Sequence, residues 1–336
     1  MMAILITGGA GFIGSNFIVY FRQQYPNVKI VNIDKLTYAG DLFNLNEIKN
    51  NENYIFIKGD ICDKDLIEKL FKEYDFSGVI HFAAESHVDN SINSPIEFIN
   101  TNVFGTFNLL DVAKNHWVSS PHQVKQKHKQ SRFLHISTDE VYGTLGDKGL
   151  FTEHTPYAPN SPYSASKASS DFLVRSYCHT YGLNVVTTNC SNNYGPKQHD
   201  EKLIPTVIRK ALKGENIPIY GDGKNIRDWL YVEDHCRGID LVFNKGITGE
   251  TYNIGGKNEC NNLYIANTIC EILDDIKPKN TSYKEQISFV QDRHGHDYRY
   301  AIDASKIENE LGWRANENFE SGIKKTITWY INKYQL

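Results

Sequence analysis

Short apolar runs rich in Ile and Val alternate with longer segments of helical periodicity through the first half of the chain. The runs predict strands, and the periodic segments predict amphipathic helices. Strands are expected at residues 3–7, 29–33, 54–58, 78–82, 133–137 and 184–188, and helices at 12–24, 64–74, 96–114 and 164–181. This alternation is typical of βαβ units in a parallel sheet. We therefore expect an α/β fold with a doubly wound parallel sheet, whose ligand crevice lies at the carboxyl ends of the strands.

The pattern loosens after about residue 190 into shorter pieces separated by glycine-rich turns, such as 220–223 and 253–256. We expect a first domain over residues 1–190 and a smaller lobe over 191–336, with an approximate boundary and lobes that can interleave. Residues 117–131 form a polar, basic stretch, which lacks the periodic apolar side chains that would pack it against the rest of the protein. This stretch predicts a surface insertion.

The composition is that of an ordinary globular protein, because 40% of the 336 residues are hydrophobic and 23% are charged. No apolar stretch approaches the roughly 20 residues of a membrane helix, and the N-terminus has no signal-peptide pattern. We therefore expect a cytoplasmic protein that does not bind a membrane. The net charge of -4 and the scattered Lys and Arg residues argue against a nucleic-acid polymer as a partner.

The six cysteines contain no C-x-x-C pair and are too sparse for a disulfide scaffold. We interpret them as free thiols. The motif His294-Gly295-His296 lacks Cys or carboxylate partners at ligand spacing in the sequence. No metal site is expected.

A glycine-rich turn directly follows the first predicted strand and directly precedes the first predicted helix, with glycines at Gly8, Gly11 and Gly14. Residues without a Cβ let the backbone and the helix N-terminus approach a pyrophosphate, which predicts a dinucleotide site. A tight turn alone explains one glycine of the three. Asp34 ends the second strand, where a carboxylate can bind both ribose hydroxyls and repel a 2′-phosphate. This favours NAD over NADP, although the neighbouring Lys35 leaves NADP open.

Other strand ends offer further contacts to a dinucleotide. Asp60-Ile61 follows the third strand and can bracket the adenine, although an Asp there is equally typical of a helix N-cap. The small residues Ala83 and Ala84, after Phe82, let a cofactor lie against the backbone.

A Tyr and a Lys lie one helical turn apart in Tyr163-Ser164-Ala165-Ser166-Lys167. The Tyr-x-x-x-Lys spacing occurs four times in the chain, but only this copy follows the fifth strand with Ser137-Thr138 upstream. An ammonium close to a phenol favours the phenolate. We therefore expect Lys167 to lower the pKa of Tyr163 and make it a base for a sugar hydroxyl.

With these motifs the chain resembles the extended short-chain dehydrogenase/reductases that act on nucleotide sugars. The resemblance rests on T-G-x-x-G-x-x-G, on Y-x-x-x-K and on the C-terminal lobe. Within that group, the residues Ser137-Thr138-Asp139-Glu140-Val141-Tyr142-Gly143 resemble the signature of the dTDP-glucose 4,6-dehydratases. Further matches lie at 83–89, 191–196, 202–205, 227–229 and 292–297, so that the resemblance covers essentially the whole chain.

The resemblance implies a Rossmann domain that holds NAD tightly, a C-terminal lobe that binds the nucleotide sugar, and a homodimer formed through helices such as 96–114 and 164–181. The implied reaction converts dTDP-glucose to its 4-keto-6-deoxy sugar, for deoxysugar biosynthesis of the rhamnose type. C4 is first oxidised, because a C4 ketone makes the C5 proton acidic. Water then leaves across C5 and C6, and C6 is finally reduced while NAD is regenerated.

Five residues are expected to be catalytic. Tyr163, helped by Lys167, takes the C4 hydroxyl proton, and Thr138 hydrogen-bonds the same oxygen. Glu140 removes the C5 proton, while Asp139 protonates the departing C6 hydroxyl. Since adjacent residues of a strand point to opposite faces, Asp139 and Glu140 must lie on irregular chain after the strand. A solvated strand end or a helix N-terminus is the simpler interpretation of the Asp-Glu pair.

The implied binding residues fall into two sets. The expected NAD contacts are Gly8, Gly11, Phe12, Ile13, Gly14, Asp34, Lys35, Leu36, Thr37, Asp60, Ile61, Phe82, Ala83, Ala84, Ser86, Thr101, Tyr163, Lys167 and Asn193. The expected substrate contacts are Ser86, His87, Thr138, Asn192, Lys202, Leu203, Arg227, Asn262, Asp292, Arg293 and His296. Arg227 could equally be a buried arginine paired with Asp228.

The chain departs from the family pattern at three positions: His294 replaces the usual proline, Asn90 replaces the usual arginine, and Asn189 replaces a common arginine. Three other functions remain as alternatives. A related nucleotide-sugar dehydratase would share all five catalytic residues. A nucleotide-sugar 4-epimerase would need no acid and base at C5 and C6, and a non-catalytic NAD-binding sensor would need none of the five.

Overall fold

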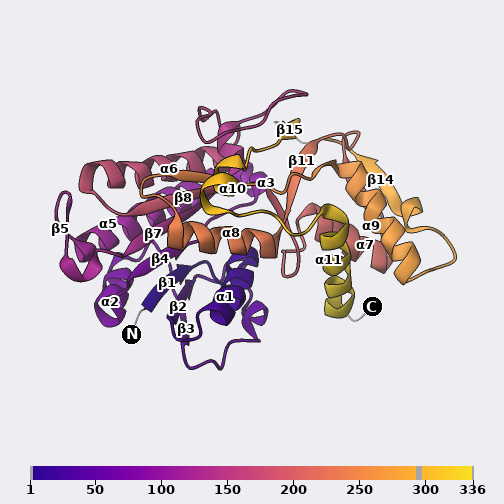
Figure 1. Cartoon of the computed structure of the whole chain (residues 1–336). Coiled ribbons are helices and arrows are strands. Elements are labelled where there is room, and N and C mark those ends of the chain that lie inside the picture. The colour runs from indigo at the N-terminus through magenta and orange to yellow at the C-terminus, as the bar shows by residue number, and fades with distance from the viewer. Residues whose placement is uncertain (1–2, 293–296, 335–336) are drawn as a thin grey trace.

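A seven-stranded parallel sheet forms the centre of the larger lobe in the computed structural model, which describes residues 3–292 and 297–334 (Figure 1). Its strands have the order β12-β8-β7-β4-β1-β2-β3. Their bounds are β1 (Ala3–Thr7), β2 (Lys29–Asp34), β3 (Tyr54–Lys58), β4 (Gly78–His81), β7 (Arg132–Thr138), β8 (Val185–Cys190) and β12 (Thr251–Ile254). Every neighbouring pair is parallel, which confirms the doubly wound α/β fold. All the carboxyl ends therefore lie along one edge.

Helices cover both faces of this sheet. The buried side chains of β1 alternate between two cores: Ile4 and Ile6 belong to the core that includes side chains of α1 (Phe12–Gln24) and α8 (Val232–Lys245). Ala3 and Leu5 belong to the opposite core, with side chains of α2 (Lys64–Tyr74), α5 (Thr106–Trp117) and α6 (Pro162–Tyr181). Because side chains on both faces of the sheet are buried, the sequences of these strands are continuous apolar runs.

The helix predicted over 96–114 is confirmed as continuous helical chain, but it is not a regular α-helix throughout. The structure has α4 (Pro95–Phe98), a π-helical segment η2 (Ile99–Gly105) and then α5. Within η2, the buried Asn102 side chain accepts a hydrogen bond from the Glu85 amide and donates to the Glu85 carbonyl and to Ser166 Oγ. These contacts to distant residues accompany the widened turn, and a hydrophobic period cannot reveal them.

The smaller lobe has its own sheets and core. One sheet contains β9 (Asn192–Tyr194), β11 (Ile226–Tyr231), β13 (Glu259–Asn261) and β15 (Arg299–Tyr300), and another pairs β10 (Ile217–Tyr220) with β14 (Ile287–Val290). Its helices are α7 (Leu203–Lys213), α9 (Asn262–Ile276) and α11 (Phe319–Tyr334). Because α8 and β12 return to the large sheet, the two lobes interleave along the chain.

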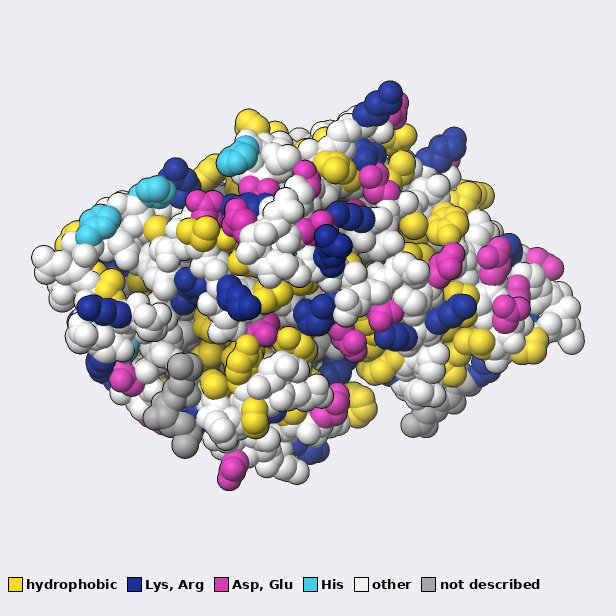
Figure 2. Space-filling view, viewed as in Figure 1, with side chains coloured by type: hydrophobic (Ala, Val, Ile, Leu, Met, Phe, Trp, Pro, Cys, Tyr) yellow, Lys and Arg dark blue, Asp and Glu magenta, His cyan; other side chains and the backbone are white. Residues whose placement is uncertain are grey.

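The remaining short elements are α3 (Val88–Asn93), α10 (Ser305–Leu311), η1 (Leu42–Leu45), η4 (Asp139–Tyr142) and η5 (Tyr283–Gln286). Within the described ranges, no helix is long and apolar enough to cross a membrane. Positive and negative side chains are interspersed over the face seen in Figure 2. All six cysteines are free, as expected.

The insertion predicted at 117–131 lies at the surface but is firmly attached. It forms a hairpin of β5 (Val118–Ser120) and β6 (Gln123–Val124), followed by the short helix η3 (Gln126–His128). Lys125 Nζ donates hydrogen bonds to the carbonyls of Asn115 and His116, at the end of α5. The surface position agrees with the prediction, and a capping lysine and the buried His128 attach the stretch without apolar periodicity.

Candidate active site

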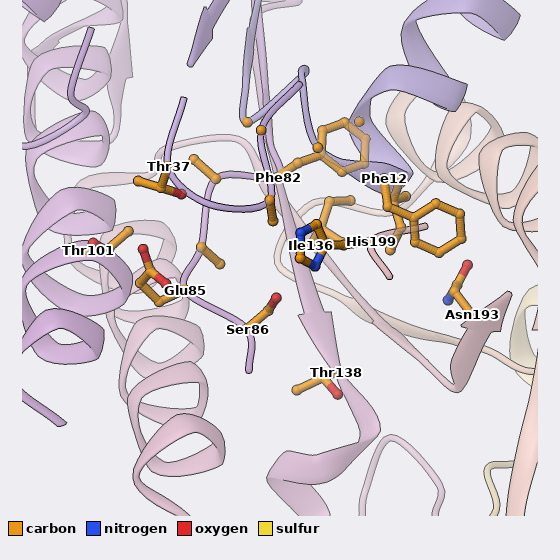
Figure 3. A pocket seen from close by; sticks show the side chains of 18 of the residues that line it. Phe12, Thr37, Phe82, Glu85, Ser86, Thr101, Ile136, Thr138, Asn193 and His199 are labelled. Atoms are coloured by element: carbon orange, nitrogen blue, oxygen red, sulfur yellow. The ribbon is translucent and has the colours of Figure 1, made fainter. Parts of the chain in front are cut away.

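One deep pocket runs along the carboxyl ends of the large sheet and has a cavity volume of about 310 Å³ (Figure 3). Most of the predicted site residues line it: Gly8, Gly11, Phe12, Ile13, Gly14, Asp34, Lys35, Thr37, Asp60, Ile61, Phe82, Ala83, Ala84, Ser86, Thr101, Thr138, Asp139, Glu140, Tyr163, Lys167, Asn192, Asn193 and Lys202. The fold thus brings all the expected NAD contacts except Leu36, four of the expected substrate contacts and all five expected catalytic residues to a single cavity.

The glycine loop closes one end of the pocket. Gly8 has a positive φ of 70°, and a Cβ on it would lie 2.5 Å from the amide nitrogen of Ala83. A Cβ on Gly14 would lie 2.5 Å from the carbonyl oxygen of Gly8, so the fold itself requires both glycines. A Cβ on Gly11 would meet only the Gly8 carbonyl oxygen, at 3.3 Å. The space over Gly11 and the N-terminus of α1 is therefore left for a ligand.

The carboxylate of Asp34 is built into this loop. Its Oδ2 accepts a hydrogen bond from the Ala10 amide at 2.9 Å, and its Oδ1 accepts one from the Leu36 amide at 2.8 Å. Burial raises the pKa of Asp34, while these two amides act to lower it. Asp34 therefore holds the loop in shape and presents its carboxylate at the cavity wall.

Lys35 is turned toward Asp60 rather than standing free beside Asp34. Its Nζ lies 2.8 Å from Asp60 Oδ2. Although partial burial by itself raises the pKa of Asp60, the hydrogen bonds from Lys35 and Cys62 hold it below the ordinary value. The N-cap alternative for Asp60 is not what the structure shows, since α2 is capped by Asp63, whose side chain accepts from the Leu66 amide.

Small and polar residues form the walls of the cavity. Figure 3 shows Thr101 and Glu85 on the side of the helices, Phe12 and Asn193 on the other side, and Thr138 where β7 ends. The Asn193 side chain donates to the Ser191 carbonyl at 3.0 Å, and its Oδ1 lies 2.9 Å from Nδ1 of the buried His235. These contacts fix the orientation of Asn193 at the wall.

The adjacent acids lie beyond the end of β7, as expected, but in the first turn of the short 3-10 helix η4 rather than on irregular chain, which agrees with the helix N-terminus alternative. Thr138 caps this helix, because its Oγ1 accepts from the Glu140 amide. Asp139 is 2% exposed, and its Oδ2 finds no hydrogen-bond partner in the part of the chain that the structure describes. Burial and, next, the negative charge of Glu140 raise the pKa of Asp139 well above its ordinary value. Both effects favour the protonated form of the Asp139 carboxyl, which is the form that a general acid requires.

Tyr163 and Lys167 reach the cavity from the first turns of α6, which Ser161 starts as an N-cap. Burial lowers the pKa of Lys167 to about 8, against the opposing effect of Asp171. The expectation that Lys167 lowers the pKa of Tyr163 is wrong for this structure. Burial and then Glu140 raise the pKa of Tyr163, and Lys167 Nζ donates to the Ile136 carbonyl at 2.8 Å.

The substrate side of the cavity joins the two lobes. Lys202 Nζ, from the start of α7, donates to the Ser86 carbonyl at 3.2 Å. His87 Nε2 lies 3.9 Å from Glu201 Oε2, so the segment after β4 is tied to the same loop of the smaller lobe.

Six predicted binding residues do not line the cavity, although the structure describes them: Leu36, His87, Leu203, Arg227, Asn262 and Asp292. Arg227 is buried, donates to the carbonyls of Ile226, Asp297 and Tyr298, and stacks 4.3 Å from the Tyr300 ring centroid. Its neighbour Asp228 accepts from the amides of Gly256 and Asn258. Arg293, His294 and His296 lie outside the described residues.

Several residues at the cavity were missed by the sequence reasoning: Ala39, Gly40, Gly59, Glu85, Ile136, Ser137, Cys190, Ser191, Gln198, His199 and Glu201. Glu85, Ser137 and Ser191 lie inside quoted motifs, so their strand-end positions could have found them. Gln198, His199 and Glu201 lie in a loop of the smaller lobe, and no local pattern marks them.

The structure describes the contacts of two of the three residues that depart from the family pattern. Asn189 is buried, and its side chain donates to the hydroxyl groups of Tyr142 at 2.9 Å and Tyr157 at 3.4 Å. The backbone amide of Asn90 lies 3.4 Å from His87 Nδ1 in the first turn of α3.

Comparison with known proteins gives the family. The family model described as GDP-mannose 4,6 dehydratase matches residues 5–326. A dTDP-glucose 4,6-dehydratase of Xanthomonas campestris pv. campestris (strain B100) is 54% identical over 98% of this chain and 93% of its own. This chain belongs to the dTDP-glucose 4,6-dehydratase family.

Solved dTDP-glucose 4,6-dehydratase structures share the whole fold. The enzyme of Bacillus anthracis str. Ames, in complex with NAD, has a TM-score of 0.88 and 47% identity over 100% of this chain and 98% of its own. The enzyme of Streptomyces venezuelae, with NAD and TYD bound, has a TM-score of 0.89 and 43% identity over 99% of this chain and 98% of its own. A UDP-glucose 4-epimerase of Thermotoga maritima has a TM-score of 0.85 over 99% of this chain and 100% of its own, but the identity is only 27%. The dehydratase family is thus favoured over the epimerase alternative.

Proposed function

We propose that this protein dehydrates dTDP-glucose to the 4-keto-6-deoxy sugar and recycles a tightly bound NAD within each turnover. The observation that carries the proposal is the buried carboxyl of Asp139, whose protonated form is favoured by burial and by the neighbouring Glu140, in the same cavity as Tyr163 and Lys167. A protonated acid next to a second carboxyl is the pair that removal of water across C5 and C6 requires.

The residues present fit a dinucleotide. The space over Gly11 at the N-terminus of α1 suits a pyrophosphate, and Asp34 at the end of β2 suits the adenosine ribose. Lys35 is paired with Asp60, so this cation is already engaged and offers little to a 2′-phosphate. Ala83 and Ala84 leave room along the wall. NAD would therefore be held by the glycine loop, Asp34 and this wall.

When bound, NAD supplies a two-electron acceptor that takes a hydride from the sugar and later returns it. Tyr163 is the candidate base for the C4 hydroxyl proton, and the hydroxyl of Thr138 acts to lower its pKa. Lys167, with a pKa of about 8, is mostly charged at neutral pH. Its ammonium does not lower the pKa of Tyr163 where it stands, and it would favour the phenolate only after turning from the Ile136 carbonyl toward Tyr163.

Elimination belongs to the two carboxyl groups of η4. Asp139 donates its proton to the departing C6 hydroxyl, and Glu140 removes the C5 proton. Glu140 lines the same cavity and is less deeply buried than Asp139. The shared helix holds the acid and the base at a constant spacing.

Neither the 4-epimerase nor the sensor alternative explains why Asp139 and Glu140 lie together in the cavity. A 4-epimerase needs no acid and base at C5 and C6, and a sensor module needs neither the pair nor Tyr163 and Lys167. A related dehydratase acting on another nucleotide-linked sugar differs only in the nucleotide contacts. We infer that side chains of the smaller lobe select the nucleotide, with Asn192, Lys202 and Arg227 as candidate contacts.

A homodimer is part of the proposal. Apolar side chains are exposed on α3, α4, η2, α5 and α6, which pack against one another: Ile92, Ile96, Ile99, Phe104, Phe107 and Phe172. A second copy of the chain would cover this face, and such a contiguous apolar surface is typical of an interface. The cytoplasmic location also remains part of the proposal, supported by the six free thiols.

The test is to incubate the purified protein, without added cofactor, with dTDP-glucose, UDP-glucose and GDP-mannose separately. We expect a 4-keto-6-deoxy product, identified by mass and NMR, to form fastest from dTDP-glucose. A C4 epimer as the product would establish the epimerase alternative, and no conversion of any sugar would favour the sensor. Faster dehydration of another nucleotide sugar would keep the chemistry and change the substrate.

A further inference from the structure

Three potential metal ligands meet at the edge of the sheet opposite the cavity. Asp75 follows α2, His116 lies in the last turn of α5, and His128 ends η3 in the insertion. Asp75 comes shortly before the amino end of β4, so this cluster lies at the amino-terminal edge of the sheet. Figure 1 shows α2, α5 and β5 together at one end of the molecule.

The ligand atoms of this cluster are close enough to share one ion. Asp75 Oδ1 lies 2.8 Å from His116 Nε2 and 3.4 Å from His128 Nε2. All three ligand atoms lie within 4.8 Å of one another. A tetrahedral zinc ion with bonds of about 2.0–2.1 Å separates its ligands by about 3.3–3.4 Å, so small side-chain rotations suffice.

His128 supplies an independent sign of a ligand. Its side chain is 3% exposed, and its Nδ1 lies 3.0 Å from Ser131 Oγ. Its Nε2, which faces Asp75, has no hydrogen-bond partner among the described residues. Buried polar atoms without a partner are rare. With the proton on Nδ1 directed to Ser131, the Nε2 lone pair would point at the ion, which is the usual arrangement of a zinc-bound histidine.

We propose that Asp75, His116 and His128 form a structural Zn²⁺ site, with water as the fourth ligand. Two imidazoles and one carboxylate favour zinc over Mg²⁺ or Ca²⁺, which prefer oxygen ligands. The ion would join the ends of α2 and α5 to the insertion. The sequence alone does not reveal this site, because the three ligands are spread over residues 75–128 without a recognisable spacing.

Lys127 is the built-in competitor of the ion. Its Nζ lies 2.9 Å from Asp75 Oδ1, and its side chain is 61% exposed. The ammonium therefore partly neutralises Asp75 without zinc and is free to swing into solvent when zinc binds. Removing this ammonium should tighten zinc binding, which a purely structural cluster of hydrogen bonds would not predict.

The experiment titrates Zn²⁺ into the untagged full-length protein, after treatment with a chelator, in competition with a chromophoric zinc indicator. We expect one saturable zinc per chain, with affinity reduced by roughly tenfold or more in His116→Gln and Asp75→Asn. Both variants keep polar side chains, and Asn tolerates the left-handed backbone of Asp75, whose φ is 48°. Lys127→Ala should bind severalfold more tightly.

His122→Asn is the matched control, because His122 is an exposed histidine of the same insertion with a positive φ. It should bind zinc like the wild type. Zinc should raise the Tm of the wild type and of this control, and EDTA should reverse the rise. Equal zinc binding by all variants, or no saturable binding by the wild type, would overturn the proposal.

Discussion

Nε2 of His135 lies 3.1 Å from Oδ1 of Asp171, and both side chains are buried close to Lys167, which precedes Asp171 by one turn of α6. Oδ2 of Asp171 accepts hydrogen bonds from Ser137 at 2.8 Å and Tyr157 at 2.9 Å. Burial raises the pKa of Asp171 to about 6, and burial lowers that of Lys167 to about 8. The charge of Lys167 acts to lower the pKa of Asp171, and the charge of Asp171 acts to raise the pKa of Lys167. Both groups are therefore ionised at a pH between about 6 and about 8.

This pair gives a prediction about pH. Asp171 acts to raise the pKa of Lys167, so Asp171→Asn should lower the pKa of Lys167 further, by roughly 1 unit. Since the reaction needs the charged ammonium, the alkaline limb of kcat/KM against pH should move to lower pH. Tyr157→Phe is the control, because it removes a hydrogen bond and keeps the carboxylate. An unmoved alkaline limb in Asp171→Asn would exclude Lys167 as the titrating group.

Oxidation and elimination should separate in variants of η4. Asp139→Asn and Glu140→Gln leave Tyr163 and Lys167 intact, so C4 oxidation should persist while elimination slows by roughly 10²- to 10⁴-fold. Reduced nicotinamide should then accumulate in a single turnover, as seen by absorbance, and deuterium incorporation at C5 should fall in Glu140→Gln. Tyr163→Phe should stop both steps. Normal dehydration by the double variant of Asp139 and Glu140 would refute the assignment.

Asp34→Ala should weaken NAD binding. The loss of charge-assisted ribose hydrogen bonds is expected to cost about 1.5–3 kcal/mol each, and the amides of Ala10 and Leu36 also lose their acceptor. NAD affinity is measured by calorimetry on stripped protein, and Tm reports the loosened loop. Turnover should recover at saturating NAD. If affinity is unchanged while Tm falls, Asp34 serves only the loop, and Asp60 is the next candidate for the ribose.

The purified protein should carry NAD and work without added cofactor, because each turnover restores the oxidised form. The measurement is nicotinamide released by denaturing the protein, compared with the number of chains. Active protein that contains no nicotinamide and consumes NAD in proportion to product would contradict the redox-neutral cycle.

The apolar face of α3 to α6 predicts a dimer that a single charge disrupts. Phe172→Lys places an ammonium at a side chain that is 58% exposed, and it should shift the mass measured by light scattering from dimer to monomer. Phe289→Lys is the control, since Phe289 is equally exposed, at 59%, but lies on β14 in the smaller lobe. The same mass for the wild type and Phe172→Lys would remove this face as the interface.

Local patterns determined much of the larger lobe. β1, β3, α1 and α2 have the bounds that the sequence predicts, because strand and helix periods and capping residues act within a few positions. Gly8 and Gly14 could likewise be placed from the sequence, since backbone approach at a βα turn tolerates no Cβ. The proposed catalytic residues could be named from their motifs, and all five line one cavity, because the strand ends of a parallel sheet converge on one edge.

Contacts between distant residues decided the rest. The π-helical turn at η2 depends on Asn102 meeting Glu85 and Ser166, and the return of β12 to the large sheet has no local signal. The pKa of Tyr163 depends on how deeply the fold buries the phenol, so its direction could not be inferred from the spacing to Lys167. The cluster of Asp75, His116 and His128 exists only where α2, α5 and the insertion pack. Periodicity and backbone constraints are written locally in the sequence, whereas burial, electrostatics and ligand geometry arise only from the packed chain.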